Sequence, residues 1–251
     1  MDRSFFRGFL VLMLSVTALA IGPGCTQDLL EQGLAAQKAK KHEQAVELLS
    51  RFVTQSPGQP QAWLALAQSL TALGRQEEAL GDLERALAAN PQNIALMMAK
   101  GKVLGNMERR REAVATFSEV LALEPSNVEA LKERAENLIN EAELDKAMAD
   151  LSKARSLAPS DPWVYHKLGM TEFCLNHYEK AVEHFTTAIR LAPETPLFYF
   201  SRGEIYLRHL NNKDKAVADF EKGCSLGHPL CCHELEMLKS NDQNAADQGK
   251  K

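Results

Sequence analysis

The sequence predicts an all-α chain of about six repeated helix pairs followed by a C-terminal helix. Alanine and leucine are abundant, whereas aromatic residues make up 6% of the 251 residues, a balance that favours helix over sheet. Prolines recur every 34 residues, and a fixed spacing of this size is typical of stacked helical repeats. Hydrophobic residues make up 45% of the chain, so most of it is expected to fold.

The proline spacing sets a repeat register. The recurring prolines are Pro57, Pro91, Pro125, Pro159 and Pro193. If each is position 32 of its unit, the repeats begin near residues 26, 60, 94, 128, 162 and 196. Each proline then follows the second helix of a pair, where it ends that helix.

Two columns of small residues support the same register, although they played no part in setting it. Position 8 reads Gly33, Ala67, Gly101, Ala135, Gly169 and Gly203. Position 20 reads Ala45, Ala79, Ala113, Ala147 and Ala181, with Ala216 displaced by one residue. Small side chains at these points allow the two helices of a pair to approach closely, and one pair alone cannot bury its apolar stripe.

In its period and in these columns the chain resembles the tetratricopeptide repeat family over residues 26–228. The resemblance implies a right-handed α–α superhelical solenoid of about six helix pairs. It also implies a concave groove that is lined by the first helix of each pair and binds other proteins. Positions 2, 5, 9, 12 and 13 of each repeat usually face that groove.

The candidate groove residues differ along the chain. Repeats two to four place polar and charged side chains at these positions, among them Lys132 and Glu136, which are expected to pair across one helical turn. Repeats five and six carry apolar and aromatic candidates: Trp163, His166, Met170, Phe173, Leu197, Phe200 and Leu207. Exposed apolar surface of this kind marks interaction sites. The alternative is that the C-terminal helix or the curvature of the array buries these side chains as ordinary core.

Residues 1–25 resemble a bacterial signal peptide. Arg3 and Arg7 flank the start of an apolar run that ends at Ile21, too short to span a bilayer comfortably. Gly24 and Cys25 resemble the end of a lipobox, which makes Cys25 the candidate lipidation site, although Gly22 stands where lipoboxes usually have leucine. The expected location is the cell envelope, as an outer-membrane lipoprotein that faces the periplasm. Cleavage after the Ala18–Ala20 segment, giving a periplasmic or secreted protein, and an uncleaved anchor are the alternatives.

The C-terminal end departs from the repeat pattern. Repeat six carries one extra residue in its turn and lacks the final proline in register. Residues 229–240 are expected to form a capping helix, with Leu230, Leu235 and Leu238 available to cover the last repeat. Residues 241–251 are polar without periodicity and are expected to be disordered.

A cluster of cysteine and histidine residues lies close to this end. It consists of Cys224, His228, Cys231, Cys232 and His233. Its spacing matches no zinc framework, so no metal is expected. The local sequence is similar to that of Sel1-like repeats, which implies a disulfide between Cys224 and Cys232 in an oxidising compartment. Free buried thiols remain the alternative there, and they are the expected state of Cys174.

No motif for catalysis or for a cofactor is present. The chain lacks a phosphate-binding loop, a nucleophile elbow, a zinc-protease helix motif and a dinucleotide-binding glycine pattern. A formal net charge of −4 argues against nucleic acid as a partner. We therefore expect no enzymatic activity and no cofactor, a protein or peptide partner, and membrane attachment if Cys25 is lipidated. The alternative is a soluble periplasmic or secreted adaptor or regulatory subunit without an anchor.

Overall fold

The computed structural model describes the backbone of residues 23–248 and the side chains of residues 27–240. Residues 1–22 of the predicted signal peptide (residues 1–25) and the side chain of Cys25 lie outside these described residues, as do residues 249–251. The described part consists of thirteen helices joined by short turns, without strands.

Twelve of these helices form six antiparallel pairs. The first helices of the pairs are α1 (Pro23–Lys38), α3 (Pro60–Ala72), α5 (Ile94–Asn106), α7 (Val128–Asn140), α9 (Pro162–Cys174) and α11 (Pro196–Arg208). The second helices are α2 (His42–Gln55), α4 (Gln76–Ala89), α6 (Arg110–Leu123), α8 (Leu144–Leu157), α10 (Tyr178–Leu191) and α12 (Lys213–Ser225). Helix α13 (Pro229–Gln248) follows the last pair.

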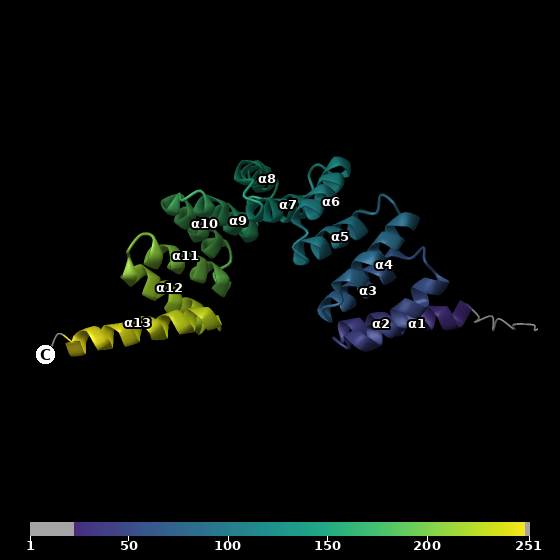
Figure 1. The fold of residues 1–251 in the computed structure, drawn as a ribbon, viewed down its shortest axis with the longest axis horizontal. Helices are drawn as coiled ribbons and strands as arrows, with labels where there is room; N and C mark the ends of the chain where they lie inside the picture. The colour runs from purple at the N-terminus through teal and green to yellow at the C-terminus, as the bar shows by residue number, and fades with distance from the viewer. Residues whose placement is uncertain (1–22, 249–251) are drawn as a thin grey trace, which may run out of the picture.

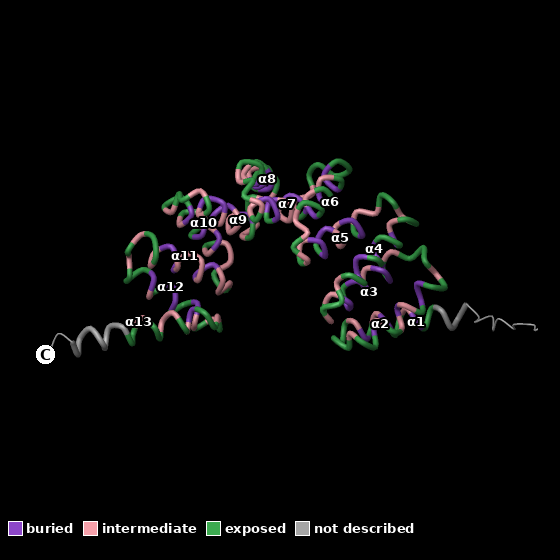
Figure 2. Tube along the Cα trace, viewed as in Figure 1, coloured by how far each residue is buried: buried purple, intermediate pink, exposed green. Residues whose placement is uncertain are grey.

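The pairs stack into an arch, with α1 and α2 at one foot and α13 at the other (Figure 1). Helices α1, α3, α5 and α7 each contact the first helix of the next pair. Helices α3, α5, α7 and α9 lie on the inner side of the arch (Figure 1). Buried residues run along the whole arch instead of forming one central core (Figure 2). The predicted all-α repeat solenoid is therefore confirmed.

The helix boundaries follow from local sequence signals. Helices α3, α5, α7, α9 and α11 begin at residues 60, 94, 128, 162 and 196, the residues at which the proline register starts each repeat. Proline occupies the first turn of α3, α9 and α11, where its missing N–H group has no helical partner to lose. Asn93, Asn127 and Asp161 cap α5, α7 and α9 through side-chain oxygens.

Glycine at position 8 makes room for a large ring from the second helix. A Cβ atom added to Gly169 would lie 2.7 Å from the ring of Phe185, and one added to Gly203 would lie 2.7 Å from Phe220. Both phenylalanines are fully buried. The two repeats that carry alanine at position 8 have leucine at the matching position of the second helix, and the first repeat combines Gly33 with Leu49, so phenylalanine occurs there only opposite glycine.

Aromatic residues at position 4 connect three of the first helices, α3, α9 and α11, to the end of the preceding repeat. Trp63 Nε1 donates a hydrogen bond to the carbonyl oxygen of Pro57 at 2.7 Å. The Tyr165 hydroxyl donates to Pro159 at 3.0 Å, and Tyr199 makes the same bond to Pro193 at 3.0 Å. The prolines thus both end a helix and present a carbonyl that holds the next repeat in place.

The C-terminal helix is longer than the sequence predicts. The capping helix was expected to end at residue 240 and to be followed by a disordered tail over 241–251, but α13 continues to Gln248. No proline or glycine occurs between Leu230 and Gln248, so nothing in the chain forces the helix to end earlier.

Candidate functional site

A cavity opens between α9 and α11 on the inner side of the C-terminal half. Its volume is about 320 Å³. Its lining is His166, Met170, Phe173, Phe185, Leu197, Phe200, Ser201, Glu204 and Ile205. Most of this lining is apolar, with Glu204 as the one carboxylate, so the cavity has the composition typical of a ligand pocket, apolar with few polar groups.

Five of the seven groove candidates meet at this cavity. They are His166, Met170, Phe173, Leu197 and Phe200, and all five are partly buried. The array therefore neither exposes these side chains fully nor closes over them as core. They leave an accessible apolar hollow between two neighbouring repeats.

Trp163 lies beside the cavity and not in it. Its ring packs edge-on against Phe198 at 5.0 Å between centroids and against His166 at 5.7 Å. The residue is nevertheless 42% exposed, and it borders a second, polar cavity with Lys132 and Lys167. Trp163 thus stands where the polar and apolar parts of the groove meet.

Leu207, the seventh groove candidate, does not line the cavity. It is partly buried and packs on the core cluster that contains Phe220 and Cys231. Cys231 belongs to α13, and the docking of α13 on α12 brings this cluster against the end of α11. Leu207 is therefore in contact with the core of the last repeat, as Phe200 is, and its place in the groove stays a prediction.

Four lining residues were not predicted: Phe185, Ser201, Glu204 and Ile205. Glu204 occupies position 9 of repeat six, which is a groove position, so a signal for it existed in the sequence. Phe185 comes from the second helix and reaches the cavity because Gly169 has no side chain to block it. The contribution of Phe185 to the cavity depends on how α10 packs against α9, which the sequence pattern does not give.

His166 is a neutral group in this cavity. Burial, assisted by Lys167, lowers the pKa of His166 to about 4. Its Nε2 atom lies 3.1 Å from Ser201 Oγ, and that hydroxyl donates to the Leu197 carbonyl at 3.1 Å. The hydroxyl is therefore free to accept from Nε2–H, which fits the uncharged imidazole.

The stability of this region is expected to depend on pH through His166. The unfolded chain binds a proton near pH 6.5 whereas the folded site does so near 4, so acid favours unfolding across that window. The loss is roughly 1.4 kcal/mol per pH unit and stops below the folded pKa. Amide exchange of α9 and α11 at pH 7 and pH 5 measures it, with His166→Phe expected to reduce the difference. An unchanged difference in that variant would assign the effect to His184, whose pKa burial also lowers.

The groove over repeats three to five is a network of ion pairs between successive first helices. Lys102 reaches Glu129 at 2.9 Å, and Lys132 reaches Glu129 and Asp161, both at 2.9 Å. Burial raises the pKa of Glu129, but hydrogen bonds from Lys102 and Lys132 outweigh it and lower this pKa to about 2. The predicted Lys132–Glu136 pair is wrong, because Glu136 pairs with Lys167 of the next repeat.

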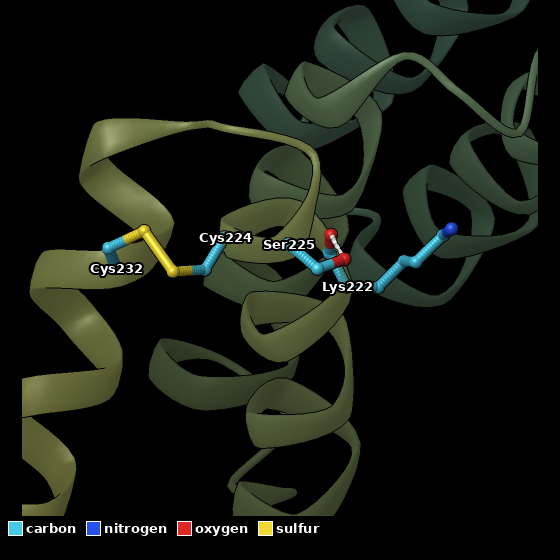
Figure 3. Close-up of a disulfide and its surroundings, with 4 residues drawn as sticks. All are labelled: Lys222, Cys224, Ser225 and Cys232. Carbon is cyan, nitrogen blue, oxygen red and sulfur yellow. Dashed lines mark hydrogen bonds between the residues drawn. A yellow bond between two sulfur atoms is a disulfide. The ribbon is translucent and has the colours of Figure 1, made fainter.

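The cysteine cluster contains one disulfide. Cys224 on α12 and Cys232 on α13 are bonded, with their Cα atoms 4.7 Å apart (Figure 3). Cys231 is buried and free, with a pKa that burial raises to about 11. Cys174 is free as expected, but it is exposed and not buried. Among the described residues no group of three or more His, Cys, Asp or Glu side chains is arranged to hold a metal.

A helix that crosses a bilayer must have about 20 consecutive, mostly apolar residues. No helix within residues 23–248 is both long and apolar enough to cross a bilayer.

Known structures share this architecture. A tetratricopeptide repeat protein from Parabacteroides merdae matches with a TM-score of 0.73 at 19% identity, over 88% of this chain and 89% of that one. PilW, a type IV pilus biogenesis factor, gives 0.71 at 18% identity over 80% and 93%. MamA of Desulfovibrio magneticus RS-1 gives 0.57 at 24% identity over 66% and 93%. These likenesses show the fold alone, and no curated protein sequence matches the chain.

Sequence models of the tetratricopeptide repeat match most of the chain. The matched segments are residues 30–94, 98–162, 162–195 and 197–226. Together they cover all six helix pairs and end at α12. The chain is therefore a member of the tetratricopeptide repeat family.

Proposed function

We propose that this protein is a non-enzymatic scaffold in the cell envelope that binds a partner protein or peptide on its concave face. The observation that carries the proposal is the accessible apolar cavity between α9 and α11, bordered by the half-exposed Trp163. Membership of the repeat family supports protein binding in general. Export and anchoring through a lipidated Cys25 rest on the sequence of the first 25 residues.

The C-terminal half of the groove is the favoured contact surface. The ion pairs between α5, α7 and α9 already satisfy the charged groups of the middle repeats, so a partner would gain little from displacing them. Trp163 and the apolar cavity offer surface that a partner can remove from water at low cost. Tryptophan is also among the residues that dominate binding energy at interfaces.

Trp163→Ala is expected to weaken partner capture by a factor of about 30 or more, the loss typical of a central interface residue. A photo-reactive amino acid at position 163 should cross-link the partner in cells, and affinity for the captured partner should then be measured with both proteins purified. Leu157→Ala is the matched control, because Leu157 is 44% exposed, close to the 42% of Trp163, but lies at the end of a second helix. Equal affinities for the two variants would contradict the proposal.

Intact mass of the mature protein tests the anchor. A chain that begins at Cys25 with added acyl mass supports the lipid-anchored scaffold. A chain cut after Ala20 without acyl mass supports the alternative, a soluble periplasmic or secreted adaptor. The full-length mass would overturn both processing routes.

A further inference from the structure

Helix α13 takes the place of the first helix of a seventh repeat. It begins with Pro229, as α9 and α11 begin with Pro162 and Pro196. The residue two positions after each of these prolines is fully buried: Val164, Phe198 and Cys231. Because the three helices bury the same position, they present corresponding faces to the inside of the array.

This register places two exposed apolar side chains of α13 on the groove face. Leu230 corresponds to Trp163 and Leu197, and Met237 corresponds to Met170 and Glu204. Leu230 is 53% exposed and Met237 is 49% exposed. Apart from two leucines at helix ends, Leu230, Met237 and Trp163 are the most exposed large hydrophobic residues among those described. We call this surface the apolar groove and define it as Trp163, Met170, Leu197, Phe200, Leu230 and Met237.

The carboxylate of Glu204 lies within the apolar groove and is only half satisfied. Its Oε2 atom accepts a hydrogen bond from Arg208 Nε at 2.7 Å. Its Oε1 atom is buried and has no hydrogen-bond partner among the described residues. A buried carboxylate oxygen without a donor is unfavourable, so the site is poised to accept a donor from a ligand.

The charge around Glu204 favours a cation. Arg208 also donates to Glu234 Oε1 at 3.0 Å, so one guanidinium serves two carboxylates and one negative charge remains in excess. The neighbouring His166 is uncharged at neutral pH, and the other lining side chains are apolar or hydroxyl groups. No cationic side chain borders the cavity to compete for Oε1.

We propose that the apolar groove binds an amphipathic peptide segment that inserts a lysine or arginine side chain, flanked by apolar anchors, into the cavity beside Glu204. The aliphatic stem lies against Met170, Phe173 and Leu197, and the cationic head donates to Glu204 Oε1. This inference rests on the proposed function and specifies its ligand. An acidic side chain is repelled, and a purely apolar one leaves Oε1 without a donor, so both are discriminated against.

Small probes test the chemistry of the cavity without knowledge of the partner. The protein, with ¹³C-labelled methionine methyl groups, is titrated with n-hexylammonium, 1-hexanol and hexanoate. We expect hexylammonium to shift the Met170 methyl signal saturably and to bind at least about tenfold more tightly than the other two, the advantage of a charge-assisted hydrogen bond. Met107 and Met148, which lie against other core clusters, should stay unshifted.

Two substitutions assign the preference to Glu204. Glu204→Gln keeps the shape and removes the charge, and should reduce the preference for the cation to about twofold or less. Glu236→Gln, at an exposed carboxylate on α13, is the control and should retain it. Arg208→Ala removes the guanidinium that partly neutralises Glu204 through Oε2 and should strengthen hexylammonium binding. Circular dichroism establishes that each variant is folded.

The outcomes separate this inference from the proposed function. Equal binding of the three probes, a preference that persists in Glu204→Gln, or no shift of Met170 with any probe would each overturn the cation site. Capture that depends on Trp163 would still stand in all three cases. Conversely, a cation preference at Met170 together with Trp163-independent capture would leave the site valid and refute the proposed partner surface.

Discussion

Replacing Asp219 with alanine is expected to lower the free energy of unfolding of the last repeats by about 3–5 kcal/mol, the cost of leaving a buried charge without its partner. Asp219 on α12 is 4% exposed. It accepts two hydrogen bonds from Arg202 on α11, at 2.9 and 2.7 Å. Arg202 also donates to Thr186 Oγ1 of the preceding repeat at 2.9 Å. The guanidinium thus joins three helices, and it stays mostly buried when the carboxylate is removed.

Urea denaturation followed by circular dichroism measures this loss. The double variant Arg202→Met with Asp219→Leu removes both charges and is expected to cost much less than Asp219→Ala alone, because no unpaired ion remains. Asp214→Ala, at an exposed carboxylate of the same helix, is the control and should stay within about 0.5 kcal/mol of the parent protein. If the double variant is as unstable as the single one, the desolvation argument fails.

The same connection occurs two repeats earlier. Arg134 donates two hydrogen bonds to Asp150, both at 2.7 Å, and a third to Ser118 at 3.0 Å. These residues occupy positions 7, 23 and 25, the positions of Arg202, Asp219 and Thr186 apart from the one-residue slip in repeat six. In repeats four and six, an arginine at position 7 therefore fixes the helix pair to the one before it.

Repeat two lacks this arginine, and its aspartate has a different ionic partner. Asp82 occupies position 23, but position 7 is Leu66, and Asp82 pairs instead with the more exposed Arg85. Burial raises the pKa of Asp82 in spite of Arg85. The ionic partner of the buried aspartate is therefore set by the residue at position 7 of the facing helix: arginine there pairs with it, and leucine there leaves it to an arginine of its own helix.

The architecture could be predicted because the same sequence signals recur from repeat to repeat. Proline follows each of the first five second helices, and glycine or alanine at position 8 allows the close packing on residues such as Phe185 and Phe220. Each of these signals is local and acts through backbone geometry or size. Because they recur at one spacing, the residues at which the first helices begin could be predicted from the sequence.

The site was only partly predictable, since it depends on how the last three first helices align. The turn and second helix of repeat six shift the register, so α13 starts 33 residues after α11 instead of 34. Columns with a fixed spacing therefore do not align Leu230 and Met237 with groove positions. Leu230 was expected to cover the last repeat, but it is 53% exposed, whereas Leu235 and Leu238 pack on the last core cluster. The unsatisfied oxygen of Glu204 depends on side-chain placement, which no sequence period encodes.

Removing the Cys224–Cys232 disulfide is expected to destabilise the docking of α13 by about 2–3 kcal/mol, the value typical of a short closed loop. Helix α13 packs mainly against α12, through Cys231, Leu235 and Leu238 and the cluster around Phe220. The disulfide adds a covalent link between the two helices to this apolar contact (Figure 3). Its loss should let α13 open locally while α1 to α10 stay folded, because repeats contact only their neighbours.

Hydrogen exchange measures this opening and links it to binding. Paired Cys224→Ser and Cys232→Ser substitutions should speed amide exchange in α13 strongly, in α12 modestly and in α5 not at all. Cys174→Ser, at the exposed free thiol, is the matched control and should change none of these rates. Because α13 carries Leu230 and Met237, the opened protein should bind partner as weakly as a Leu230→Ser and Met237→Ser variant with the disulfide intact. Normal affinity in the opened protein would show that the partner uses only α9 and α11, which would remove α13 from the apolar groove.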